Sequence, residues 1–234
     1  MPLNISGSIV NSSIASTLNY KSIVTRGLSI HFDASAKDSY PETGTSWYDL
    51  VKSSTGTLTN GPTYSSSNGG SILFDGTNDR VSTGLFPSGV RTYMIWIKYN
   101  SATGTGGYQL TGTQQGDAYT YTGRQDNGNP YTYGGSGGNG GATAGYTLNT
   151  ATWYYQGFTL ASNGDLGIYV NGSLLETKTG NGLGSTPTSE FSIGCINQNH
   201  WVNGNIAVVH LYDRVLSTAE VLQNYNAQKS RFGL

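Results

Sequence analysis

The sequence predicts an all-β protein, a sandwich of two antiparallel sheets with one short helix near the C-terminus. Glycine (34 residues) and tyrosine (17) are abundant in the 234 residues, while charged residues make up only 11%, a balance that suits turns and sheet faces. Short apolar runs recur between turns rich in Gly, Asn and Ser, as in sandwiches and barrels. All-β chains of this length commonly form one domain, so we expect a single core.

The chain is expected to begin with an extended N-terminal arm, residues 1–27, before a domain over residues 28–234. The arm is polar and follows no regular period, yet it contains five aliphatic residues: Ile5, Ile9, Val10, Ile14 and Leu18. Two interpretations stay open. The arm docks on another subunit and buries these side chains there, or it folds back on its own sandwich.

Seven runs are predicted to be strands: Leu28–Phe32, Ser71–Asp75, Thr92–Tyr99, Trp153–Leu160, Leu166–Val170, Phe191–Ile196 and Ile206–Tyr212. Thr92–Tyr99 is apolar on both faces, which is typical of a central strand. Asn171 and Gly172 tolerate positive φ, so a type I′ hairpin is expected there. The Phe74 ring should be buried just before a turn, and Trp153 is expected to pack between the sheets.

One helix is predicted after the last strand, ending at about Lys229. Ser217 and Glu220 fit a capping box, and Leu216 with Val221 fits a hydrophobic staple. The apolar side of this helix is narrow and consists of Val221, Leu222 and Tyr225. We therefore expect the helix to lie against the edge of the sandwich.

Four blocks of sequence occur in a recognisable order: Gly27–Ala34, Leu73–Asp79, Trp153–Gly172 and Gly204–Ser217. Together they resemble the laminin-G-like, concanavalin-A-like lectin/glucanase family, in the version found in structural proteins of tailed-phage virions. The resemblance implies a concanavalin-A-like jelly-roll sandwich of two curved antiparallel sheets. It does not specify an activity, because this fold carries several.

Acidic residues give little sign of catalysis. Glycosidases need two carboxylates flanking the scissile bond, and neighbours on one strand face are two residues apart. The 13 Asp and Glu residues never come that close; the nearest pairs are Asp38 with Glu42 and Asp75 with Asp79. We therefore predict no catalytic residue, although carboxylates far apart in sequence could converge in space.

No cofactor or metal is predicted either. The turn Asp75–Asp79 offers oxygen ligands for calcium, but an Asx turn without metal is favoured. The three histidines lack zinc spacing, and the single Cys195 is expected to be a buried thiol. With a net charge of −1, scattered Lys and Arg, and no long apolar run, neither nucleic-acid binding nor membrane insertion is expected.

The region 104–145 is rich in Gly and Tyr. It fits either flexible, poorly packed loops or an adaptable binding surface in which tyrosine rings and amides contact a ligand. A second candidate loop contains Gln198 and His200. The predicted ligand-binding residues are Tyr121, Arg124, Asn127, Tyr131, Tyr133, Asn199 and Trp201.

These observations and the resemblance lead to one functional hypothesis. The chain is expected to be a non-enzymatic virion surface protein, a capsid decoration or fibre-associated subunit made in the host cytoplasm. Its expected partners are other virion proteins contacted through the arm, host surface glycans contacted through the loops, and further copies of itself. The alternatives are a lectin module for host receptor attachment and a glycan hydrolase.

Overall fold

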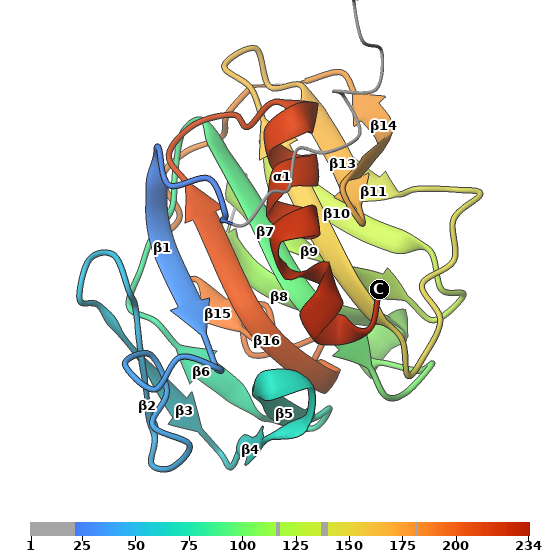
Figure 1. Cartoon of the computed structure of the whole chain (residues 1–234). Coiled ribbons are helices and arrows are strands. Elements are labelled where there is room, and N and C mark those ends of the chain that lie inside the picture. Colours follow the sequence, from blue (N-terminus) through green and yellow to red (C-terminus); the bar gives the residue numbers. More distant parts are fainter. Residues whose placement is uncertain (1–21, 116–117, 137–139, 181) are drawn as a thin grey trace, which may run out of the picture.

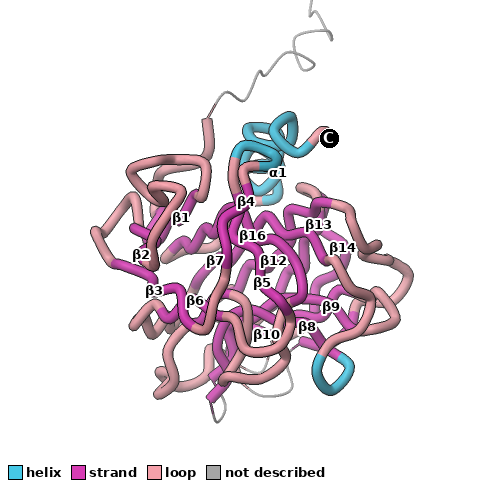
Figure 2. Tube along the Cα trace, turned by 90° about the horizontal axis from the view of Figure 1, so that it is seen from below, coloured by secondary structure: helices cyan, strands magenta, loops and turns pink. Residues whose placement is uncertain are grey.

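The computed structural model describes residues 22–115, 118–136, 140–180 and 182–234. Two antiparallel sheets stack face to face, and the helix α1 lies on one outer side of the pair (Figures 1 and 2). The predicted all-β sandwich is thus confirmed. No helix in the part of the chain that the structure describes is long and apolar enough to cross a membrane.

The first sheet, sheet A, has eight strands. Seven follow one another in the order β14 (Ser173–Lys178), β13 (Leu166–Val170), β12 (Trp153–Leu160), β7 (Arg91–Tyr99), β16 (Asn203–Tyr212), β5 (Ser71–Asp75) and β4 (Thr63–Ser65). The eighth, β1 (Leu28–Asp33), pairs with the last part of β16, while β5 pairs with its first part. The predicted strands of this sheet are all present.

The second sheet, sheet B, also has eight strands, in the order β11 (Gly140–Ala142), β10 (Pro130–Gly135), β9 (Ala118–Gln125), β8 (Tyr108–Gln115), β15 (Ser192–Ile193), β6 (Arg80–Ser82), β3 (Thr55–Thr59) and β2 (Ser46–Tyr48). The strand predicted over 191–196 is real but shorter. Interpreting region 104–145 as flexible loops was wrong, because its described residues form β8 to β11. Buried threonines hold these strands together, as in the 3.0 Å contact between the Thr122 and Thr132 hydroxyls.

Strand β7 shows how the core is divided. Its odd-numbered residues, such as Ile95, face sheet B, whereas Met94 and Trp96 face the opposite, outer side of sheet A. Trp153 of β12 lies on that outer side too, with its ring 4.7 Å from the ring of Phe232. The expectation that Trp153 packs between the sheets was therefore wrong, because alternation along β12 turns it outward.

Helix α1, Thr218–Gln228, begins with the predicted capping box: the Ser217 hydroxyl accepts a hydrogen bond from Glu220 N, and the Glu220 carboxylate accepts one from Ser217 N. Its predicted position at the sandwich edge was wrong. The helix lies across the outer face of sheet A (Figure 1), where Trp96 stacks on Tyr225 at 5.7 Å and on Phe232 at 4.0 Å. The large apolar rings on this face require such a cover.

Three local predictions are confirmed. Asn171 (φ 50°) and Gly172 (φ 81°) form the tight turn between β13 and β14, in agreement with a type I′ hairpin. Phe74 is fully buried in the core, and Gly76 turns the chain just after it. Cys195 is a buried free thiol, as expected.

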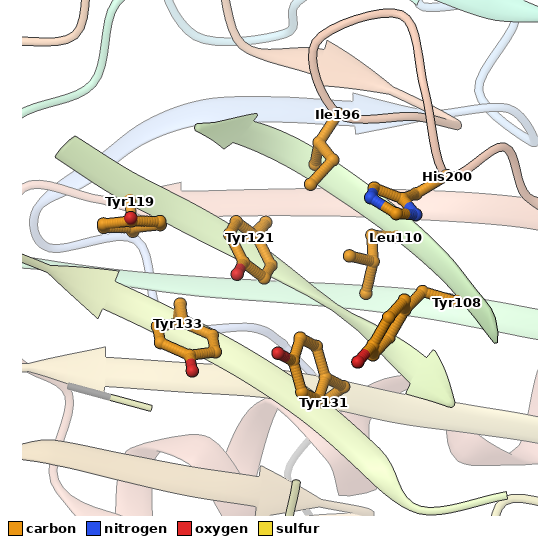
Figure 3. A pocket seen from close by; sticks show the side chains of 8 residues that line it. All are labelled: Tyr108, Leu110, Tyr119, Tyr121, Tyr131, Tyr133, Ile196 and His200. Atoms are coloured by element: carbon orange, nitrogen blue, oxygen red, sulfur yellow. The ribbon is translucent and has the colours of Figure 1, made fainter. Parts of the chain in front are cut away.

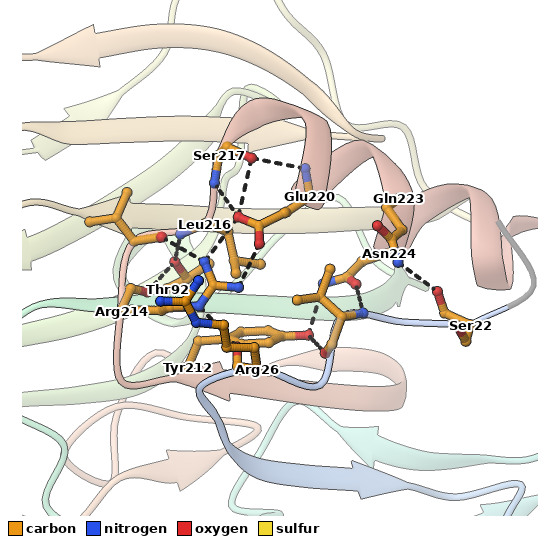
Figure 4. A network of polar contacts seen from close by, with 12 residues as sticks. Ser22, Arg26, Thr92, Tyr212, Arg214, Leu216, Ser217, Glu220, Gln223 and Asn224 are labelled. Atoms are coloured by element: carbon orange, nitrogen blue, oxygen red, sulfur yellow. Dashed lines mark hydrogen bonds and ion pairs between the residues drawn. The ribbon is translucent and has the colours of Figure 1, made fainter. Parts of the chain in front are cut away.

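The described end of the arm packs on the domain (Figure 4). The Val24 N–H donates to Asn224 Oδ1 at 2.8 Å, and the Tyr212 hydroxyl donates to the Val24 carbonyl at 2.9 Å. Gln223 also donates to the Ser22 carbonyl. Residues 22–27, which the sequence assigns to the arm, are therefore part of the packed structure, while residues 1–21 lie outside the described residues.

Candidate functional site

A pocket opens on the outer face of sheet B, the face turned away from sheet A (Figure 3). Its cavity measures about 250 Å³. The lining residues are Tyr108, Leu110, Tyr119, Tyr121, Tyr131, Tyr133, Ile196 and His200. The tyrosines come from three neighbouring strands, β8, β9 and β10, and His200 comes from the loop between β15 and β16. We call this site the tyrosine pocket.

The alternation of strand side chains explains why the rings meet. Residues two apart on a strand share a face, so Tyr131 and Tyr133 both point outward from β10. Tyr121 lies directly opposite Tyr133 in the register of β9 and β10, and their ring centroids are 5.4 Å apart. Tyr108 approaches Tyr131 to 4.6 Å. The rings form one continuous aromatic surface.

Two glycines make room for these rings. Gly112 lies opposite Tyr121, and a Cβ at Gly112 would come within 2.8 Å of the Tyr121 Cβ. A Cβ at Gly140 would lie 2.7 Å from Cγ of Tyr133. Both glycines have positive φ (133° and 143°), which side-chain-bearing residues rarely adopt. The missing side chains let the tyrosines lie against the strand backbone.

Two tyrosine hydroxyls of the pocket, those of Tyr121 and Tyr131, are held in the neutral form. Tyr121 is only 4% exposed, and burial, reinforced by the neighbouring phenols, raises its pKa far above the usual range. Burial and contact with Tyr133 likewise raise the pKa of Tyr131. Both hydroxyls therefore keep their protons and can donate as well as accept hydrogen bonds.

His200 adds a nitrogen to the pocket. Its Nδ1 lies 2.8 Å from the Thr105 carbonyl oxygen, and because a carbonyl can only accept, Nδ1 is the protonated donor. In the neutral ring Nε2 then presents a lone pair. The ring also meets Tyr108 edge-on at 5.4 Å. His200 thus supplies a hydrogen-bond acceptor beside an aromatic surface.

Three predicted ligand-binding residues, Tyr121, Tyr131 and Tyr133, line the pocket together. Arg124 does not, because alternation along β9 turns it toward the interior. Its Nη1 donates to the carbonyls of Ser101 and Ala102. Its role is to hold that loop against the strands.

The other three predicted residues lie outside the pocket lining. Asn127 is exposed in the turn between β9 and β10, where its Oδ1 accepts from Asn129 N. Asn199 is exposed, and its Oδ1 accepts from His200 N at 2.8 Å, so it supports the pocket's histidine. Trp201 is half-buried and is not part of the lining.

The lining also contains residues that were not among the predicted binding residues. Tyr108 and Tyr119 were visible as part of the tyrosine-rich region, and the spacing of Tyr119 and Tyr121, two residues apart, was a signal for one strand face. Nothing in the sequence marks Leu110 or Ile196. Leu110 reaches the pocket through the pairing of β8 with β9, and Ile196 reaches it from the loop between β15 and β16.

One of the two acidic pairs that lie nearest in sequence, Asp75 and Asp79, borders a different cavity of about 420 Å³. Asp79 Oδ2 accepts from Asp75 N at 3.0 Å, and Asp75 Oδ1 accepts from Thr77 N at 2.8 Å. These bonds build an Asx turn. Within residues 22–115, 118–136, 140–180 and 182–234, no three His, Cys, Asp or Glu side chains are grouped to hold a metal ion.

Solved structures with the same fold include a Trypanosoma rangeli sialidase in complex with sialic acid, with a TM-score of 0.65 and 18% identity. The match covers 90% of this chain but 34% of the sialidase, so the chain spans about a third of that protein's length. Domain 4 of AbnA, an extracellular arabinanase from Geobacillus stearothermophilus solved with arabinotriose, has a TM-score of 0.65 and 16% identity, covering 85% of this chain and 98% of that domain.

Sequence comparisons place the chain in a family. No curated protein matches it. The family model of the concanavalin A-like lectin/glucanases superfamily, however, matches residues 74–222, which is more than half of the chain and includes most of both sheets. This protein therefore belongs to the concanavalin A-like lectin/glucanase superfamily.

Proposed function

We propose that this protein is a carbohydrate-binding module and that its ligand occupies the tyrosine pocket. The observation that carries the proposal is the set of five tyrosine rings on one outward face of sheet B. Sugars present apolar C–H faces edged by hydroxyls. Tyrosine ring faces can pack on the C–H faces, while phenol hydroxyls and a histidine nitrogen can form hydrogen bonds with the sugar hydroxyls.

A solved relative in fold supports a saccharide as the class of ligand. The arabinanase domain, almost all of which this chain matches, was solved in complex with arabinotriose. The size of the pocket is consistent with this class. At about 250 Å³ it is smaller than the roughly 300–1,000 Å³ of sites for drug-sized ligands, so it fits one sugar residue of a longer chain.

The module is proposed to bind its sugar without cleaving it. Hydrolysis of a glycosidic bond needs a pair of carboxyl groups flanking the bond, and none of the described residues that line the pocket carries a carboxylate. Release of reducing ends from neutral or acidic polysaccharides, measured with purified protein, should not exceed the background. Turnover that disappears in Asp79→Asn would contradict the proposal.

Binding can be tested by titration against a panel of oligosaccharides. Tyr133→Ala removes a ring that contacts Tyr121 and Tyr131, and should weaken binding at least about tenfold, or about 1.4 kcal/mol. Tyr48→Ala is the matched control, since Tyr48 is an exposed tyrosine on β2, at the opposite end of sheet B. Equal loss in both variants, or none in Tyr133→Ala, would contradict this placement of the ligand.

We further propose that the module is carried on the surface of a virion, as a capsid decoration or fibre-associated subunit. The resemblance of the four sequence blocks to tailed-phage structural proteins supports this, as do the aliphatic residues of the N-terminal arm, whose first 21 residues lie outside the described structure. In this proposal the arm contacts a neighbouring virion protein and the pocket contacts a host glycan.

The virion proposal is tested by deleting residues 1–21. Residues 22–27 are kept because Val24 packs on the domain. The truncated protein should retain its thermal midpoint, and labelled protein should no longer decorate purified particles under the electron microscope. Decoration equal to that by the full chain would contradict the role of the arm, and absence of the full chain from particles would contradict the virion location.

A further inference from the structure

We infer that the tyrosine pocket selects neutral sugars and discriminates against sugars that carry a carboxylate. This inference rests on the proposed carbohydrate-binding function and specifies its ligand class. It follows from three features of the site: the absence of charged side chains from its lining among the described residues, the engagement elsewhere of two arginines that contact or belong to the tyrosine strands, and the tautomer of His200.

Among the described residues, the lining contains five tyrosines, two aliphatic residues and one histidine, but no Lys, Arg, Asp or Glu. A carboxylate brought against these rings would give up hydrating water. Removing an anion from water is costly unless a cation or several donors replace the water. A neutral sugar hydroxyl loses much less hydration energy, and one hydrogen bond to a phenol or to a ring nitrogen can replace its lost water.

Two arginines that contact or belong to the tyrosine strands are already engaged. Arg124, on β9, lies on the opposite face of the sheet, with its guanidinium 5.5 Å from the Tyr99 ring and its Nη1 bonded to loop carbonyls. Arg91 donates from Nη2 to the Tyr119 carbonyl at 2.8 Å and from Nη1 to the Gly89 carbonyl. Both residues are 3% exposed. Neither can turn to a ligand without breaking these bonds.

The Tyr121 hydroxyl shows how the pocket treats an anion. Burial among neighbouring phenols raises the pKa of this group, which means that the surroundings oppose the phenolate. A ligand carboxylate at the same place would meet the same surroundings. Burial that disfavours the phenolate would likewise disfavour a ligand carboxylate buried among these rings.

His200 reinforces the discrimination. The Thr105 carbonyl holds its Nδ1–H, so the neutral ring offers a lone pair at Nε2. The ring edge formed by Nδ1 and Cε1 faces Gly106. A Cβ added at Gly106 would lie 3.6 Å from Nδ1 and 3.3 Å from Cε1. The Nε2 edge therefore points away from that loop. Nε2 can accept a hydrogen bond from a sugar hydroxyl. A carboxylate oxygen cannot donate one, and its lone pairs would repel the lone pair of Nε2.

The test compares matched ligands by calorimetric titration of the full chain at pH 8, where histidine side chains are predominantly uncharged. Each pair is chosen with the same anomeric configuration and linkage, so that it differs only by a carboxylate or a carboxylate-bearing residue: galactose with galacturonic acid oligomers, glucose with glucuronic acid oligomers, and lactose with sialyllactose. For whichever neutral sugar binds, its acidic counterpart should bind at least about tenfold more weakly, or not detectably.

A charge introduced at the pocket should reverse this preference. Tyr119→Lys places an ammonium group in the lining, and Tyr119→Gln removes the same ring without adding charge. The ratio of acidic to neutral affinity should rise at least about tenfold in Tyr119→Lys relative to Tyr119→Gln. Tyr108→Lys and Tyr108→Gln form a second pair at the other side of the pocket, to be used if the first pair fails to fold by circular dichroism.

The outcomes separate this inference from the function on which it rests. Equal binding of neutral and acidic partners, or tighter binding of the acidic one, would overturn the selectivity while leaving carbohydrate binding intact. An unchanged ratio in the folded lysine variant would overturn it as well. If no saccharide of either kind binds, the proposed function fails and the selectivity fails with it.

Discussion

His31 and His210 lie directly opposite each other on β1 and β16, with ring centroids 4.8 Å apart. His210 is fully buried on the helix side of sheet A, and its Nδ1 lies 3.0 Å from the Tyr155 hydroxyl. Among the described residues, Nε2 of neither ring has a hydrogen-bond partner. Burial, followed by the proximity of His31, lowers the pKa of His210 well below its ordinary value.

The stability of the domain should therefore fall in mild acid. The folded state resists protonating His210, while the unfolded chain takes up that proton below its ordinary pKa of about 6.5. The contribution is fully present above this pH and is lost as the pH drops below it, by up to about 1.4 kcal/mol per pH unit. Urea unfolding between pH 7.5 and 5 measures the slope.

The matched variant is His210→Asn, in which an amide can still bond the Tyr155 hydroxyl but cannot titrate. It should be less stable than the parent at pH 7.5, yet show a flatter dependence of the free energy of unfolding on pH. Burial also lowers the pKa of His31, although the carboxylates of Asp33 and Asp49 partly oppose this effect. Some dependence of the free energy of unfolding on pH should therefore persist in His210→Asn. Parallel slopes for the parent and His210→Asn would contradict the assignment.

The capping box gives a second prediction. Ser217→Ala removes the acceptor for Glu220 N and should lower the free energy of unfolding by about 0.5–2 kcal/mol. Ser66→Ala is the control, because Ser66 precedes a short 3₁₀ helix without a side-chain capping bond and should change little. Thermal or urea unfolding compares the two, and equal effects would show that the Ser217 bond contributes nothing specific.

The C-terminal 3₁₀ turn, Lys229–Phe232, gives a third prediction. Phe232 is 5% exposed and its ring contacts those of Trp96 and Trp153. Phe232→Ala should cost about 3–5 kcal/mol, because it removes a buried ring and leaves a cavity over the sheet. Leu234→Ala, at an exposed neighbouring position, should be close to neutral. A small loss in Phe232→Ala would mean that the two tryptophans close the gap by themselves.

The glutamate of the capping box forms a wider network with a predicted consequence at low pH. Arg214 places its Nη2 2.6 Å from Glu220 Oε1, and its Nε donates a hydrogen bond to the Arg26 carbonyl (Figure 4). The hydrogen bonds from Arg214 lower the pKa of Glu220 to about 2. Its stabilising effect is thus present above the ordinary pKa of a glutamate and is lost toward pH 2. In Glu220→Gln, unfolding followed between pH 5 and 2 should depend less steeply on pH.

Local order was readable from the sequence. Period-two alternation marks β1, the mostly apolar run marks β7, Asn171–Gly172 marks the hairpin, and the spacing of Ser217 and Glu220 marks the helix start. Each of these signals spans only a few residues, because the local structure depends on the side chains of those residues themselves. The weaker strands β8 to β11 escaped prediction, because glycines and threonines give them little apolar contrast.

The candidate site shows most clearly what could not be predicted from the sequence. The sequence alone determined that Tyr121, Tyr131 and Tyr133 belong to a low-charge, ring-rich region, since composition carries that information. Only the tertiary structure decided that Arg124 turns inward and that His200 joins the rings. The physical reason is register: shifting a strand by one residue exchanges its two faces, and that choice depends on pairing between segments far apart in the chain.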